Sequence, residues 1–79
     1  VVTVRVRYFA AAAEATGLDA EERVEPTLAG LRAAVMADHP ALAAILDRCA
    51  VLVDGRREDA DVDLSDARHV DVLPPFAGG

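Results

Sequence analysis

Apolar and polar residues alternate at both ends of the chain. Residues 2–8 carry an apolar side chain at each even position with Thr or Arg between them, and residues 69–72 repeat the alternation as His, Val, Asp and Val. A period of two is typical of a strand that buries one face and exposes the other. We therefore predict a strand at each end of the chain.

Two further strands are predicted in the interior of the sequence. Residues 50–53 form a short apolar run that leads directly into an Asp-Gly pair at 54–55, which is typical of tight turns between strands. Residues 20–25 contain little apolar material, but they lie between a turn-prone segment and Pro26, which helices exclude from their interior. We interpret residues 20–25 as an edge strand and residues 56–63 as polar and irregular.

Three segments have the composition or the spacing of helices. Residues 10–16 are strong helix formers and end at Gly17, which suits the left-handed residue that closes many helices. Thr27 can cap the next helix, whose apolar residues recur from Leu28 at the spacing of one buried face. Pro40 interrupts this helix and suits the first position of another.

The segment after Pro40 repeats the core spacing, with Leu42, Ile45, Leu46 and Cys49 at the recurring positions. The order of elements is therefore strand, short helix, strand, helix, strand, turn and strand. This order predicts an α+β domain in which helices pack on one face of a small mixed sheet.

The composition indicates one small globular domain with an aliphatic core. The chain has 79 residues, 53% of them hydrophobic, but only three aromatics, so Val, Leu, Ile and Ala must build the core. Its eight arginines are scattered among fourteen acidic residues, for a net charge of −6. There is no basic stripe for phosphates and no apolar run long enough for a membrane, so we expect neither nucleic acid nor a membrane as a partner.

The cysteine and histidines do not form a reactive or metal-binding pattern. Cys49 is the only cysteine and no signal-peptide pattern is present, so we expect a cytoplasmic location. Cys49 lies on the apolar stripe with only Arg48 as a basic neighbour, which predicts a buried thiol. His39 and His69 lack ligands at zinc spacing, so we expect each to be a helix cap or exposed.

A run of alternating aspartates resembles the start of a calcium-binding loop. Asp59, Asp61 and Asp63 have the required spacing, but Leu64 occupies the position of the essential glycine and Val70 that of the bidentate glutamate. We interpret this run as a solvated acidic loop. With no phosphate-binding loop and no serine nucleophile motif, the sequence predicts no metal and no self-contained active site.

The last seven residues, LPPFAGG at 73–79, have a pattern of their own. Pro74 and Pro75 can neither extend a sheet nor enter a helix, so they predict a stiff, extended stalk. Gly78 and Gly79 follow as a tip with almost no side chain, which suits the presentation of a terminal carboxylate inside another protein. A frayed chain end is the alternative.

The chain resembles the ubiquitin-like sulfur carriers of the MoaD/ThiS family, specifically the MoaD-like small subunits of molybdopterin synthase. The resemblance covers the whole chain and depends on VRYFA at 6–10, VLVDG at 51–55 and VDVLPPFAGG at 70–79. The terminal Pro-Pro-x-x-Gly-Gly is its specific element. Two departures are Ala-Arg at 67–68, where the family often has Gly-Asp, and Arg-Arg at 56–57, where an apolar partner contact is common.

The resemblance implies a β-grasp domain over residues 1–73 followed by an extended tail over residues 74–79. The Gly79 carboxylate would be adenylated by an ATP-using activating enzyme and converted to a thiocarboxylate. This group would donate sulfur to a cyclic pterin precursor in molybdenum cofactor biosynthesis. The chain would bind no cofactor and would not be an enzyme by itself, because the catalytic residues are expected in the large subunit of the synthase.

The resemblance also implies which residues meet the large subunit. The tail residues expected to insert are Pro74, Pro75, Gly78 and Gly79, and those expected to make apolar contacts are Phe9, Leu73 and Phe76. Two alternatives stay open: a sulfur carrier of thiamine biosynthesis, and a ubiquitin-like modifier joined through Gly79 to lysines of target proteins.

Overall fold

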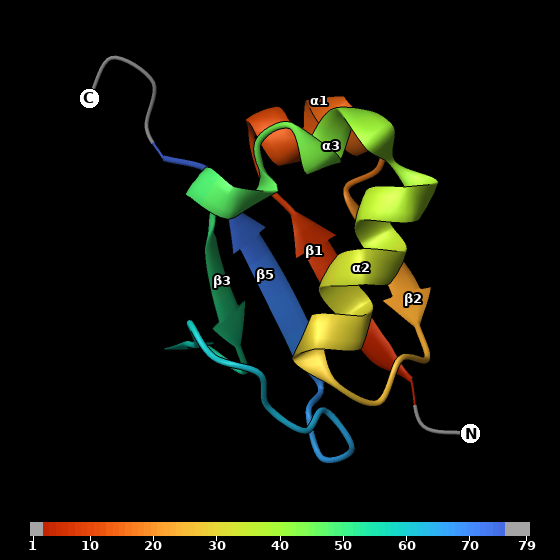
Figure 1. Cartoon of the computed structure of the whole chain (residues 1–79), viewed down its shortest axis with the longest axis vertical. Coiled ribbons are helices and arrows are strands. Elements are labelled where there is room, and N and C mark those ends of the chain that lie inside the picture. Colours follow the sequence, from red (N-terminus) through yellow and green to blue (C-terminus); the bar gives the residue numbers. More distant parts are fainter. Residues whose placement is uncertain (1–2, 76–79) are drawn as a thin grey trace.

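Nine short elements make up the computed structural model, which describes residues 3–75 (Figure 1). In chain order they are β1 (Val4–Tyr8), α1 (Ala11–Thr16), β2 (Ala20–Arg23), α2 (Leu28–Asp38), α3 (Pro40–Ala43), the 3-10 helix η1 (Leu46–Arg48), β3 (Ala50–Val53), β4 (Arg56–Arg57) and β5 (His69–Leu73). Every predicted strand is present, and so are the helices, except that the helical segment expected from Pro40 through Cys49 is divided into α3 and the short η1. One prediction was wrong, because Arg56–Arg57 form a strand and were expected to be irregular.

The strands form one mixed sheet in the order β2-β1-β5-β3-β4. The two strands predicted from alternation, β1 and β5, lie side by side in parallel, with Val6 opposite Val70. All other pairs are antiparallel. The segment interpreted as an edge strand is confirmed at one edge of the sheet as β2, and β4 forms the other edge.

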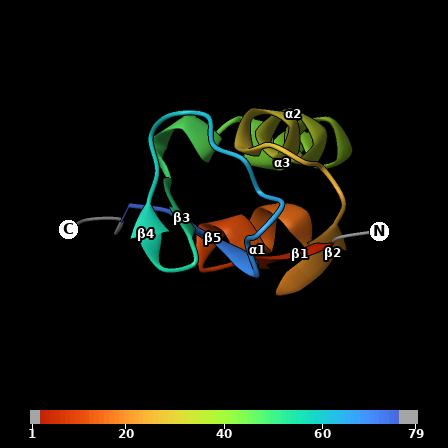
Figure 2. The same cartoon turned by 90° about the horizontal axis from the view of Figure 1, so that it is seen from below.

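Helices α2 and α3 cover one face of the sheet, and α1 lies beyond the end of β1 (Figures 1 and 2). Residues from α2, α3, η1 and the alternate strand positions form the core, and the largest fully buried side chains are Leu28, Leu42, Leu46, Leu64, Val6 and Val70. Burying one such side chain contributes roughly 1.5–3 kcal/mol. A small mixed sheet with helices on one face is the β-grasp fold, which confirms the predicted class.

Side chains cap the start of α2 from two directions. Thr27 Oγ1 accepts a hydrogen bond from the N–H of Gly30 at 3.1 Å, as the sequence predicted. Asp61 Oδ1 accepts one from the N–H of Ala29 at 2.8 Å, although the acidic loop was interpreted only as solvated. In the same loop Asp63 is hydrogen-bonded to the following turn. The exposed aspartates therefore help to hold this long connection against α2.

The turn between β3 and β4 lies at the end of the sheet where β5 begins. Asp54 and Gly55 both have positive φ, 51° and 83°, as a tight hairpin turn requires. The Asp54 carboxylate also accepts hydrogen bonds from the N–H groups of Arg68 and His69, both at 3.0 Å. These bonds lower the pKa of Asp54 and link the hairpin to the start of β5.

Asp71 departs from the alternation expected of the last strand. Its exposed fraction is only 8%, although it lies on the face that the helices leave open. The Arg7 guanidinium on β1 covers it and donates two hydrogen bonds to its carboxylate, one of them 2.7 Å long. Asp71 is buried because β5 is a central strand whose neighbour supplies a bidentate partner.

A polar network joins β1 and β2 to the junction of α2 and α3. Glu21 Oε2 accepts a 2.6 Å hydrogen bond from the Tyr8 hydroxyl and lies 2.8 Å from His39 Nε2. Arg23 donates to Glu21 and also to Glu25 and Asp38. His39 is the residue that ends α2 and precedes α3, so the expected helix cap is confirmed. Its side chain is largely buried, because Glu21 and the Tyr8 ring lie against it.

The Glu21 network predicts that acid destabilises the fold. Burial acts to raise the pKa of Glu21, but hydrogen bonds from Tyr8, His39 and Arg23 outweigh it and hold the pKa below its ordinary value of 4.5. The stability that Glu21 contributes to the fold is therefore present above about pH 4.5 and is lost as the pH falls through the folded-state pKa of Glu21. Glu21→Gln should lower the free energy of unfolding by about 1–2 kcal/mol at neutral pH and weaken its acid dependence.

Urea unfolding at several pH values measures this effect. Glu22→Gln is the matched control, because Glu22 is the exposed neighbour on the same strand and lies outside the network. An equally steep loss of stability in acid for Glu21→Gln and the wild type would contradict the prediction.

Candidate functional site

The predicted tail begins where the sheet ladder ends. Strand β5 stops at Leu73, and Pro74 and Pro75 follow it outside any helix or strand. Proline has no N–H group, so neither residue can donate to a neighbouring strand. Phe76, Gly78 and Gly79, the other predicted tail and contact residues, lie outside the described part of the chain.

Strand order brings distant residues to the base of this tail. Because β1 and β5 are parallel, their last residues lie at the same end of the sheet, and the Phe9 N–H donates to the Val72 carbonyl at 3.2 Å. Strand β3 runs in the opposite direction and begins there, with Ala50 opposite Leu73. Phe9 on one side and Ala50 on the other therefore flank Leu73.

An open groove of about 660 Å³ lies at this end of the sheet. Its floor is mainly apolar, and Phe9, Ala50, Leu73, Pro74 and Pro75 contribute to it. Phe9 is 39% exposed, which is high for a large aromatic side chain. The structure thus brings together all four predicted site residues that it describes, which are Phe9, Leu73, Pro74 and Pro75.

Charged residues at this groove were missed as site residues. Glu14 borders it from α1, on the β1 side, and Arg48 and Arg57 border it from η1 and β4, on the other side. In the sequence Arg57 stood out only as a departure from the family pattern, and Arg48 only as a neighbour of Cys49. The register that places Ala50 beside Leu73 would have identified both, since it brings η1 and β4 to the tail.

The backbone at the groove is strained at Ala10. Its φ of 50° and ψ of −122° lie in a region that favours glycine, because a Cβ atom crowds the backbone there. The strain lets α1 start directly after β1, and the Glu14 N–H then donates to the Ala10 carbonyl at 3.1 Å. Such residues cost about 1–3 kcal/mol and cluster at functional sites.

Ala10→Gly should therefore stabilise the protein, against the usual effect of glycine. We expect the free energy of unfolding to rise by about 1 kcal/mol, since Ala10 is exposed and loses no packing. The control is Ala33→Gly, in the exposed middle of α2, which should lower it by about 1 kcal/mol. Urea unfolding measures both, and a loss of stability in both variants would contradict the strain at Ala10.

Cys49 is the reactive side chain closest in sequence to the groove residues, and it is buried. Its exposed fraction is 8%, its thiol donates to the Ile45 carbonyl, and burial raises its pKa. The predicted buried thiol is confirmed. Within residues 3–75 no group of three or more His, Cys, Asp or Glu side chains is placed to hold a metal ion. The helices of this same part of the chain are too short or too polar to cross a membrane.

Comparison with known proteins identifies the family and the fold. The ThiS family pattern matches residues 6–79, so it extends to the Gly-Gly tip. No curated protein sequence matches the chain significantly.

Three solved structures illustrate the likeness. Small archaeal modifier protein 1 from Methanosarcina acetivorans is 21% identical, with a TM-score of 0.85 over 99% of this chain and 97% of that chain. The same modifier from Haloferax volcanii is 24% identical, with a TM-score of 0.75 over 99% and 100%. A complex of subunits 1 and 2 of molybdopterin-converting factor from Helicobacter pylori contains a chain 25% identical, with a TM-score of 0.74 over 99% and 100%. With a family match across nearly its whole length and a β-grasp fold, the chain belongs to the ThiS family of ubiquitin-like sulfur carriers.

Proposed function

We propose that this protein is the sulfur-carrying small subunit of molybdopterin synthase. The observation that carries the proposal is the apolar groove at the base of the Pro-Pro stalk, where Phe9 and Leu73 lie beside the start of the tail. Similarity to a subunit of the Helicobacter pylori complex supports a large-subunit partner. The tail would enter that subunit while the groove residues bind its surface, so recognition and sulfur delivery would occur at the same end of the domain.

The chemistry requires activation of the tail before sulfur can be added. A carboxylate is a poor electrophile, so an activating enzyme would join the Gly79 carboxylate to AMP from ATP, with release of pyrophosphate. A persulfide sulfur on a donor would then attack the acyl carbon and displace AMP. Reduction of the resulting acyl disulfide by a thiol would leave the thiocarboxylate on Gly79 and a disulfide on the donor side.

In these reaction steps, the role of this chain would be to position its tail. Pro74 and Pro75 would keep the tail extended, and Gly78 and Gly79 would pass through a channel too narrow for larger side chains. Phe9, Leu73 and Phe76 would anchor the domain by apolar contact, as aromatic residues commonly do at interfaces. The acids and bases that act on the cyclic pterin substrate would come from the large subunit.

A second function is favoured by the similarity to small archaeal modifier proteins, whose fold this chain shares. A modifier would use the same adenylation and then link Gly79 to lysines of other proteins. A sulfur carrier of thiamine biosynthesis is a third candidate within the same family.

The form of the tail in the native cell tests these functions. The protein would be isolated with its bound partners and its intact mass measured. Replacement of one oxygen by sulfur at the terminus, together with a co-purified large subunit, would support the proposal. Isopeptide linkage of Gly79 to lysines would instead support the modifier function. A thiocarboxylate found with only thiamine-pathway partners would support the sulfur carrier of thiamine biosynthesis.

A further inference from the structure

The groove carries positive charge in a protein that is otherwise acidic. The chain has a net charge of −6, yet two arginines, Arg48 and Arg57, border the groove against a single acid, Glu14. The local charge therefore has the opposite sign to that of the whole molecule. Such an inversion at an apolar surface calls for a partner with complementary charge.

Arg48 and Arg57 form weaker or fewer ion pairs within the chain than some other arginines do. Arg7 is paired with Asp71, and Arg23 binds three carboxylates. Across residues 3–75, no carboxylate lies within ion-pair distance of Arg48.

Arg57 has only a weak internal partner. Its Nε lies 3.3 Å from Asp59 Oδ1, but the two side chains are 66% and 82% exposed. Exposed pairs of this kind contribute about 0–1 kcal/mol and exchange readily with solvent or a partner. Both Arg48 and Arg57 are therefore available to bind another molecule.

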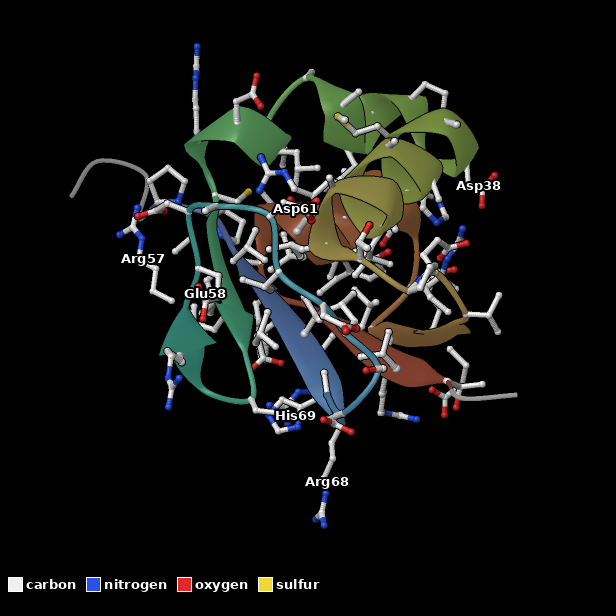
Figure 3. The ribbon with its side chains drawn as sticks, turned by 60° about the horizontal axis from the view of Figure 1, so that its bottom comes forward. Asp38, Arg57, Glu58, Asp61, Arg68 and His69 are labelled. Atoms are coloured by element: carbon white, nitrogen blue, oxygen red, sulfur yellow. The ribbon has the colours of Figure 1, made fainter. Side chains whose placement is uncertain are left out.

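Strand order places the charges on opposite sides of the groove. Arg57 pairs with Leu52 in the β3–β4 hairpin, and Leu52 pairs in turn with Asp71 of β5, so Arg57 shares the open sheet face with Leu73. In Figure 3 it projects outward from β4. Glu14 lies on α1, which follows β1 on the other side of β5. A partner would meet a basic side, an apolar floor and an acidic side in that order.

We infer that the protein surface covering this groove presents carboxylates opposite Arg48 and Arg57 beside an apolar segment that fills the floor. The inference rests on the proposed function and specifies the chemistry of the large subunit's contact surface. A polyanion such as nucleic acid fits poorly, because Glu14 and the net charge of −6 would repel it. The charge asymmetry would also allow the domain to dock in one orientation, with its tail directed into the partner.

Association kinetics with the purified large subunit test the inference. Arg48→Glu and Arg57→Glu should each lower the association rate constant by about tenfold at low salt, with a smaller effect at high salt. Arg68→Glu is the matched control, because it changes the charge equally but lies before β5, at the far end of that strand from the groove (Figure 3). Arg48→Gln and Arg57→Gln should lower the association rate constant by an intermediate amount. They replace the glutamate variants in the test if one of those fails to fold.

Each result separates the inference from the proposed function. Reduced rates for the groove variants and an unchanged rate for Arg68→Glu would support the acidic partner surface. If the wild type binds and all variants bind at the same rate, the inference is overturned and the proposed function stands. Absence of binding by the folded wild type would overturn both.

Discussion

Deletion of Gly78 and Gly79 is expected to abolish thiocarboxylate formation and leave the fold intact. The deleted chain would still end in a carboxylate, on Ala77, but two residues short of the position that the activating enzyme would adenylate. The buried core is built from residues 4–72 and does not include the tip. The free energy of unfolding should therefore change by less than about 0.5 kcal/mol. Intact-mass spectrometry after incubation with the activating enzyme, ATP and a sulfur donor measures acceptance, and circular dichroism during heating measures stability.

A chain extended by one alanine after Gly79 provides the control for this deletion. It keeps both glycines and a terminal carboxylate but moves the carboxylate by one residue, so it should also fail to accept sulfur. Sulfur acceptance by the deleted chain, or a large fall in its melting temperature, would be incompatible with the proposed role of the tip.

Phe9→Asp is expected to weaken binding to the large subunit by about a hundredfold or more. The substitution would place a charge in a contact that loses its water on binding, which typically costs several kcal/mol when the charge is unpaired. Phe9 is 39% exposed and follows the end of β1, so the fold should tolerate the change. Isothermal titration of the folded variant into the large subunit measures the loss.

Leu18→Asp is a close control for this experiment. Leu18 is 38% exposed, almost the same as Phe9, but it lies between α1 and β2 and does not line the groove. Its substitution should leave the affinity within about threefold of the wild type. Equal affinities for Phe9→Asp and Leu18→Asp would remove the groove from the interface. The contact expected of Phe76 stays a prediction.

Much of the fold could be predicted because its signals are local. The alternation in β1, the cap at Thr27, the proline that starts α3 and the Asp-Gly turn each depend on residues only a few positions apart. The apolar contacts at Phe9 and Leu73 were expected from the family resemblance, and the groove brings them together.

The features that could not be predicted depend on which strands become neighbours. Asp71 is buried by Arg7, and His39 pairs with Glu21, only because β5 lies beside β1 and the α2–α3 junction lies over β2. The basic side of the groove likewise requires β4, a two-residue strand whose charged sequence carries no apolar pattern. These contacts join positions too distant for periodicity to reveal.

The parallel pairing of β1 with β5 has a consequence for synthesis. Residues 5–8 find their partners only at 69–72, so the centre of the sheet cannot close until residue 72 has left the ribosome. A high share of such distant contacts slows folding. Because β5 directly precedes Pro74 and Pro75, a nascent chain completes its fold at about the time its tail emerges. Chains whose synthesis stops before β5 would remain unfolded and be removed by proteolysis before they could occupy a partner's binding site.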